Sequence, residues 1–104
     1  MEEIEFEKLY KLSLIGQHYE SIGEIEKSVE IYEYMIQKNW DGSHIYERLS
    51  IHYKKNKKYT DVDRVIKKYL EVYTIWLNKN KYPIETDNKY NKFKKRLDSI
   101  QKYL

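Results

Sequence analysis

The sequence of 104 residues contains no cysteine and no alanine, and it has only one proline and three glycines. The absence of cysteine excludes disulfide bridges and thiolate metal sites, and it suits a reducing compartment. No apolar run approaches the roughly 18 residues that a membrane-spanning helix needs. The first ten residues, MEEIEFEKLY, are acidic and interrupted by charges, unlike a signal peptide. We therefore expect a cytoplasmic protein without a membrane segment, forming a single domain over residues 1–104.

Lysine, isoleucine, asparagine and tyrosine are abundant, a bias that we attribute to an AT-rich coding sequence from a bacterial or phage genome. The charge is unevenly distributed along the chain. Residues 1–41 carry ten acids and four bases, a balance of −6, whereas residues 42–104 carry seven acids and sixteen bases, a balance of +9. Such asymmetry indicates either a nucleic-acid surface or complementary docking between molecules.

The spacing of apolar residues predicts five helices. They are expected over residues 3–21, 25–38, 44–53, 60–79 and 84–104. Gly23 and Pro83 interrupt the helical pattern, because glycine favours helix ends and proline cannot occupy a helix interior. Ser43 is predicted to cap the third helix, and Thr60 with Asp63 resembles a weak capping box for the fourth. The apolar set of the fourth helix is too wide for one stripe, so we expect the third helix and the last one to cover it on two sides.

An internal repeat becomes visible when the sequence is shifted by 34 positions. Ile15 then falls on Leu49, Tyr19 falls on Tyr53, and similar residues continue to coincide over some sixty positions. A period of this length is typical of stacked helical hairpins.

The residues at the repeated positions resemble the tetratricopeptide repeat, whose core pattern is W-x2-L-G-x2-Y. The matching residues are Leu12, Ile15, Gly16 and Tyr19 in residues 9–42, and Tyr46, Leu49, Ser50 and Tyr53 in residues 43–76. The resemblance implies an all-α, right-handed helical-hairpin solenoid of five antiparallel helices, ended by a capping helix over residues 84–104. Met35 and Tyr69 stand where the family has small residues, so we expect the paired helices to lie further apart than usual.

The helix that ends a solenoid needs a polar outer face. In the capping helix we expect this face to consist of Lys92, Lys94, Lys95, Arg96 and Lys102.

No residue pattern indicates catalysis. The three histidines, His18, His44 and His52, do not have the clustered spacing of metal ligands. The sequence also lacks a glycine-rich phosphate loop and other catalytic motifs. We therefore expect neither enzyme activity nor a bound cofactor or metal.

The resemblance implies that the inner face of the first helix of each hairpin binds another protein. Carried over by repeat position, this face consists of Tyr10, Ser13, Gln17, Glu20 and Ser21 in the first copy, and of His44, Glu47, Arg48, Ile51, Lys54 and Lys55 in the second. Two repeats form only a short groove, which favours a protein surface or a helical segment as the partner.

The charge asymmetry suggests two alternative functions. Nucleic acid could bind the basic C-terminal half, since clustered bases on one face neutralise phosphates. The candidate contacts are Lys57, Lys58, Lys92, Lys95 and Arg96. Alternatively, the acidic end of one molecule could dock on the basic end of another, giving a homodimer or a larger self-assembled structure.

Overall fold

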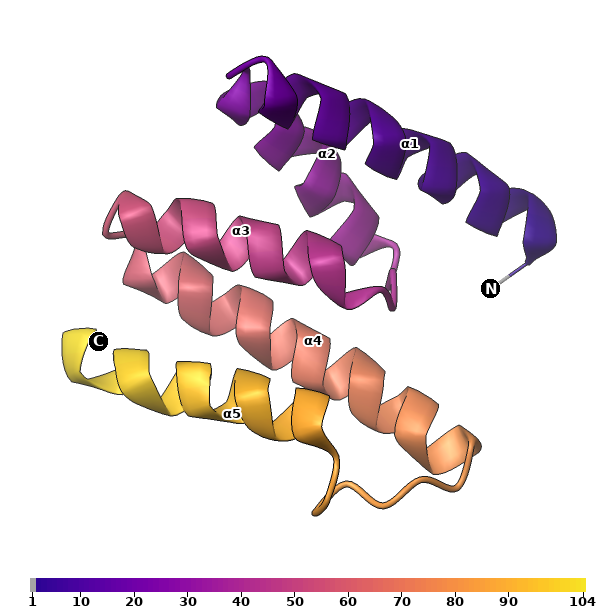
Figure 1. The fold of residues 1–104 in the computed structure, drawn as a ribbon, viewed down its shortest axis with the longest axis vertical. Coiled ribbons are helices and arrows are strands. Elements are labelled where there is room, and N and C mark those ends of the chain that lie inside the picture. The colour runs from indigo at the N-terminus through magenta and orange to yellow at the C-terminus, as the bar shows by residue number, and fades with distance from the viewer. Residues whose placement is uncertain (1) are drawn as a thin grey trace. The chain divides into compact units, whose positions relative to one another are not determined.

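The computed structural model describes residues 2–104, in which all regular secondary structure is helical. Five α-helices and one short 3-10 helix follow one another along this range (Figure 1). They are α1 (Glu3–Ser21), α2 (Ile25–Gln37), α3 (Ser43–Lys55), α4 (Tyr59–Lys79), α5 (Asn88–Ile100) and η1 (Gln101–Tyr103). The predicted all-α fold with five helices is thereby confirmed. No helix in the described range is both long and apolar enough to cross a membrane.

The chain divides into two compact helical units, Met1–Trp40 and Asp41–Leu104. The first unit is the hairpin of α1 and α2. In the second unit, α4 packs against α3 on one side and against α5 on the other. The prediction that α4 is covered on two sides is therefore confirmed, and it explains why apolar residues surround so much of this helix.

In the first unit, α1 and α2 approach closely at Gly16. A Cβ atom at this position would lie 2.5 Å from Cε1 of Tyr32, so only glycine leaves room for the ring. Tyr32 is fully buried, and its hydroxyl donates a hydrogen bond of 2.8 Å to Oε1 of Glu20. The hairpin therefore combines a very small residue on α1 with a large one on α2. At the corresponding repeat positions, the second unit has Ser50 and Ile66, which are also buried.

We expect Gly16→Ser to destabilise the protein by about 1–3 kcal/mol, because the added atoms overlap the Tyr32 ring. Tyr32→Ile should cost about 2–4 kcal/mol, because it leaves a cavity and removes the bond to Glu20. The double variant places the residue pair of the second unit at these two positions. We expect its loss of stability to be about 1 kcal/mol smaller than the summed losses of the two single variants. Urea unfolding followed by circular dichroism measures all three values. Strict additivity would show that these two positions do not share one space.

The turns between helices use the left-handed backbone region. Gly23 has a φ angle of 81°, and Asn39, Lys57 and Lys81 have φ angles of 61°, 58° and 62°. The residue just beyond a helix end often adopts this conformation, and glycine adopts it at the lowest cost.

The turn after α1 and the turn after α3 have the same geometry and lie one repeat apart in the sequence. The helices before these turns end at Ser21 and Lys55, and the helices after them begin at Ile25 and Tyr59. The amide of Glu24 donates to the carbonyl of Tyr19 at 2.9 Å, and at the corresponding positions of the second hairpin the amide of Lys58 donates to the carbonyl of Tyr53 at 2.8 Å. The same bond also follows α2 and α4, where the amides of Trp40 and Tyr82 donate to the carbonyls of Met35 and Leu77, so this turn is the usual way in which the helices of this chain end.

Lys57 occupies the position that Gly23 has in the first hairpin. We expect Lys57→Gly to raise the free energy of unfolding by about 0.5–1 kcal/mol, because it removes the steric cost of a side chain at positive φ. Lys58→Gly is the matched control, since Lys58 has a φ angle of −90° and glycine there only adds flexibility to the unfolded chain. Thermal unfolding of both variants tests the prediction, which is wrong if they shift the midpoint in the same direction.

Two predicted helix caps and one predicted helix start were wrong. Ser43 is the first residue of α3, so Gly42 takes the cap position and no side chain caps this helix. Helix α4 begins at Tyr59, before Thr60, and the Asp63 carboxylate instead pairs with Lys67 at 2.9 Å. The C-terminal helix begins at Asn88 rather than at residue 84.

Helix α5 starts later because Asp87 provides a strong N-cap after Pro83 has ended the helical pattern. Its carboxylate accepts a hydrogen bond of 2.9 Å from the amide of Tyr90 and a second bond of 3.0 Å from the Tyr73 hydroxyl. Burial, together with this bond to Asp87, raises the pKa of Tyr73 to about 12. The residue that caps α5 is thus attached to α4.

A continuous series of aromatic rings links α4 to α5 and to the loop between them. Consecutive rings in the series have centroids 4.4–5.8 Å apart. In order they are Phe93, Tyr69, Tyr73, Trp76 and Tyr82. Such pairs add about 0.5–1.5 kcal/mol each beyond the area that they bury. They hold the loop, and through it α5, against α4.

Candidate functional site

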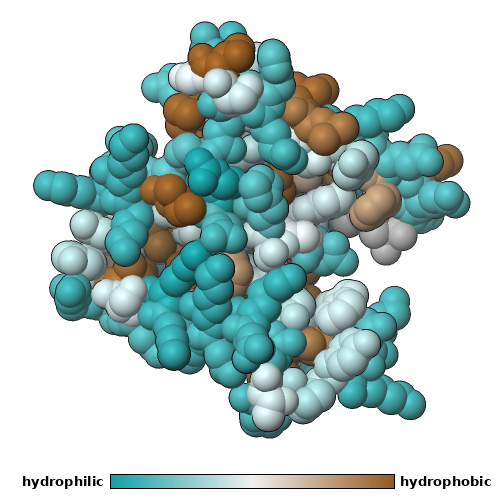
Figure 2. Space-filling model, in the orientation of Figure 1, coloured by the Kyte–Doolittle hydropathy of each residue, from teal (hydrophilic) through white to brown (hydrophobic). Residues whose placement is uncertain are grey.

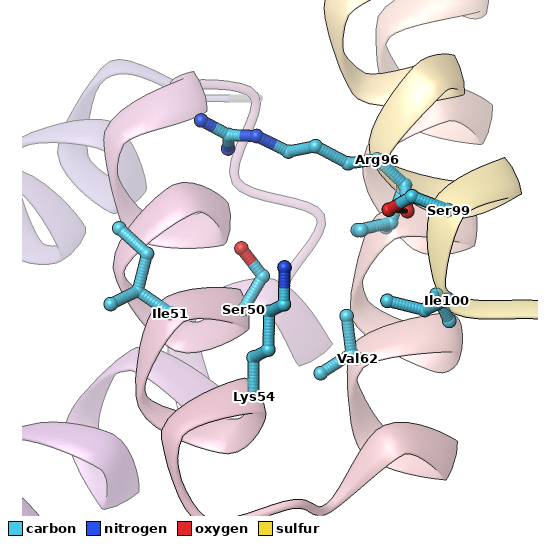
Figure 3. Close-up of a pocket in the computed structure, with 8 residues that line it drawn as sticks. Ser50, Ile51, Lys54, Val62, Arg96, Ser99 and Ile100 are labelled. Carbon is cyan, nitrogen blue, oxygen red and sulfur yellow. Dashed lines mark hydrogen bonds between the residues drawn. The ribbon is translucent and has the colours of Figure 1, made fainter. Parts of the chain in front are cut away.

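A hollow of about 130 Å³ lies in the second unit, where α3 and α5 both pack on α4 (Figure 3). Side chains from all three helices line it. They are Ser50, Ile51 and Lys54 from α3, Val62 and Ile66 from α4, and Arg96, Ser99 and Ile100 from α5. We call this feature the α3–α5 groove.

Short side chains on the two walls keep the groove open. The Ser50 hydroxyl donates to the carbonyl of Glu47 at 2.8 Å, and the Ser99 hydroxyl donates to the carbonyl of Arg96 at the same distance. Both donors are therefore satisfied within their own helices, while the hydroxyl oxygens can still accept a hydrogen bond.

The groove has an apolar floor. Val62 and Ile66 from α4 and Ile100 from α5 are almost completely buried. Ile51 on α3 belongs to the same lining, but 40% of its surface is exposed. An exposed aliphatic residue next to a buried apolar floor gives a partner an apolar surface to cover.

The charged groups of the groove centre on Glu47. Its Oε1 atom accepts a hydrogen bond of 3.0 Å from Nη2 of Arg96 and lies 3.7 Å from Nζ of Lys92. The bond from Arg96 is the main reason that the pKa of Glu47 is lowered, with the charges of Arg96, Lys92 and His44 adding to it and burial opposing it. Lys54, at the groove, forms no ion pair within residues 2–104. The mouth of the groove is therefore positively charged.

The predicted partner-binding residues of the second copy lie on α3. Ile51 and Lys54 line the groove, and Glu47 holds Arg96 at its edge. His44 and Lys55 are exposed, and Arg48 is half-buried. The structure therefore brings three residues of this set together around the groove.

The predicted residues of the first copy lie on α1 in the other unit. Tyr10, Gln17 and Ser21 are exposed. Ser13 is only 5% exposed and donates to the carbonyl of Tyr10 at 2.6 Å. Glu20 is half-buried and accepts the hydrogen bond from the Tyr32 hydroxyl. Ser13 and Glu20 thus contribute to the α1–α2 hairpin, which leaves Tyr10, Gln17 and Ser21 on the surface.

The candidate nucleic-acid contacts fall in two places. Lys57 and Lys58 lie in the turn between α3 and α4, and Lys92 and Lys95 are exposed on α5. Figure 2 shows that the side chains over α5 are mainly hydrophilic. Arg96 differs from the lysines because its side chain is half-buried, hydrogen-bonded to Glu47, and packed 5.1 Å from the Phe93 ring. It does not belong to the polar outer face that was expected for the closing helix.

The sequence analysis missed the contribution of α5 to the groove. Ser99 and Ile100 line it from α5, and α5 lies outside the two repeats from which the binding face was inferred. The available signal was the stripe that includes Phe93, Leu97 and Ile100, because the residues beside such a stripe border the neighbouring helix. Within residues 2–104, no three His, Cys, Asp or Glu side chains are placed to share a metal ion.

Comparisons with protein-family models, with curated proteins and with solved structures gave no match. The interpretation of the α3–α5 groove therefore depends on its own geometry and charge.

The bond between Glu47 and Arg96 should make the stability of the second unit depend on pH. Because the pKa of Glu47 is lowered in the folded state, the bond stabilises the protein above the ordinary carboxyl pKa, and this contribution is lost as the pH falls through the lowered value. We expect Glu47→Gln to cost about 1 kcal/mol at about pH 7 and almost nothing at about pH 2. Urea unfolding at both pH values, with Asp98→Gln as an exposed control on α5, measures the difference. An equal cost at both values would contradict the assigned role.

Proposed function

We propose that the chain is a non-enzymatic protein-interaction module that binds a partner protein through the α3–α5 groove. The observation that carries this proposal is the combination of an apolar floor, the exposed Ile51 and a positively charged mouth in one hollow. Clusters of this kind, apolar at the centre and polar at the rim, are typical of protein interfaces. A cytoplasmic location is part of the proposal.

The size of the groove supports a protein partner over a small molecule. Binding sites for drug-sized ligands have volumes of about 300–1,000 Å³, whereas the groove has about 130 Å³. A hollow of this size receives one side chain. We infer that a partner presents a surface or a helix from which a single apolar side chain projects.

The proposal also includes the likeness to tetratricopeptide repeats. Buried residues at corresponding positions of the two hairpins, such as Ser28 and Val62, support it. In such a hairpin arrangement, the first helix of the second pair, α3, lines the binding face together with the closing helix α5.

Nucleic-acid binding receives less support from the geometry. Arg96 and Lys92 both face the Glu47 carboxylate, so part of their charge is already neutralised. A second surface hollow is lined only by residues of α5, namely Asn88, Asn91, Lys92, Lys94 and Lys95. A single helix provides no opposite wall, and phosphate contacts there would be weak and sensitive to salt.

Partner capture with a matched pair of variants tests the proposed function. Ile51→Glu places a carboxylate at the groove, whereas Ile75→Glu makes the same change at an exposed position of α4 that does not line it. We expect proteins captured by the wild-type chain from its host to be lost with Ile51→Glu and retained with Ile75→Glu. The captured protein is then purified, and its binding is measured by titration with both variants.

Circular dichroism confirms beforehand that both variants are folded. An affinity that Ile51→Glu leaves unchanged would contradict the assignment of the groove, as would an equal loss with both variants.

A further inference from the structure

The α3–α5 groove places two chemical requirements on its occupant. Its volume of about 130 Å³ is close to that of an engineered protein cavity of about 150 Å³ that holds one benzene molecule. One branched aliphatic side chain would therefore fill it. Lys54 lies at the mouth without an ion pair in the described part of the chain, so a carboxylate next to that side chain would complete the contact.

The first turns of α1 present this combination on the surface of the same protein. Ile4 is 79% exposed, the largest value among the large hydrophobic residues that the structure describes. Glu7 lies one helical turn after Ile4, and Glu3 lies one turn before Glu7 on the same face, so both carboxylates lie to one side of Ile4. Neither Glu3 nor Glu7 forms an ion pair within residues 2–104.

The other exposed aliphatic residues of α1 have different neighbours. Leu14 and Ile15 lie one turn from Lys11 and His18, which would bring positive or neutral groups to a positive groove. Among the exposed aliphatic residues of α1, charge complementarity therefore selects Ile4.

The net charge of the chain points to the same pairing. Residues 1–41 have a net charge of −6 and residues 42–104 have one of +9. Opposite charges on two surfaces guide molecules toward each other and favour one orientation. A second copy of this chain would thus approach with its acidic α1 facing the basic second unit.

We propose that Ile4 of one copy enters the α3–α5 groove of a second copy, with Glu3 and Glu7 facing the latter's Lys54. The inference rests on the proposed function, since it uses the same groove. It depends on the groove within the second unit and on the exposure of Ile4 in the first unit, each taken separately. The two contacting surfaces are different, so the contact is head-to-tail and can be repeated from one copy to the next.

Sedimentation velocity tests this self-association at protein concentrations from about 20 μM to about 1 mM. The mean sedimentation coefficient should rise with concentration at about 20 mM salt, and the rise should disappear at about 500 mM salt because ions screen exposed charges. A chain that remains monomeric at the highest concentration and lowest salt overturns the proposal.

Two variants then identify the contacting surfaces. Ile4→Ser removes the inserted side chain, and Lys54→Glu reverses the charge at the groove, so each should weaken self-association by about tenfold or more. Ile75→Ser is the control and should associate as the wild type does. Each variant retains one intact surface, so an equimolar mixture of Ile4→Ser and Lys54→Glu should form a 1:1 dimer and no larger species.

The outcomes separate this proposal from the proposed function. If Lys54→Glu abolishes association and Ile4→Ser does not, a different segment occupies the groove and the proposal is overturned. If self-association is absent but Ile51→Glu still abolishes partner binding, the groove binds another protein and only the self-association proposal fails. If neither experiment responds to changes in the groove, both assignments are wrong.

Discussion

The packing of the second unit depends on the contacts of one buried residue, Tyr69. Its ring centroid is 4.9 Å from that of Tyr46 on α3 and 4.4 Å from that of Phe93 on α5. A single side chain of α4 thus contacts both helices that cover it. Burial raises the pKa of Tyr69, so its hydroxyl stays neutral in the folded state. Because α3 and α5 both contact this ring, the distance between the two helices depends on the size of the Tyr69 side chain.

Different side chains fill the corresponding positions of the two hairpins. Gly16 and Tyr32 combine a very small and a large residue, whereas the corresponding Ser50 and Ile66 divide the volume more evenly. Protein interiors are close-packed, so a gain in volume at one position must be offset at its neighbour. Gly23 and Lys57 likewise adopt the same left-handed backbone with different residues.

The sequence predicted the features that depend on short-range pattern. The five helices and the two-sided cover of α4 follow from apolar spacing, and Pro83 marks the last break. Helix starts were less predictable, because several neighbouring polar residues can cap the same helix and tertiary contacts decide among them. Asp63, for example, binds Lys67 and Gln101 instead. The groove could be predicted only in part. Ile51 and Lys54 were predicted from their repeat position. The bond between Glu47 and Arg96 spans 49 residues, and the short-range spacing of residues cannot predict a contact between such distant positions.

That long-range bond also determines the charge of the groove. Arg96 and Lys92 together carry two positive charges at the edge of α5, and Glu47 on α3 offsets one of them. Without the carboxylate, the two cations would repel each other and α5 would lose a polar attachment to α3. With it, α5 is held beside the groove while Lys54 remains without an ion pair in the described residues. A single acidic residue thus stabilises the wall of the groove and still leaves its mouth positive, so the same side chain links the stability of the second unit to the charge of the groove.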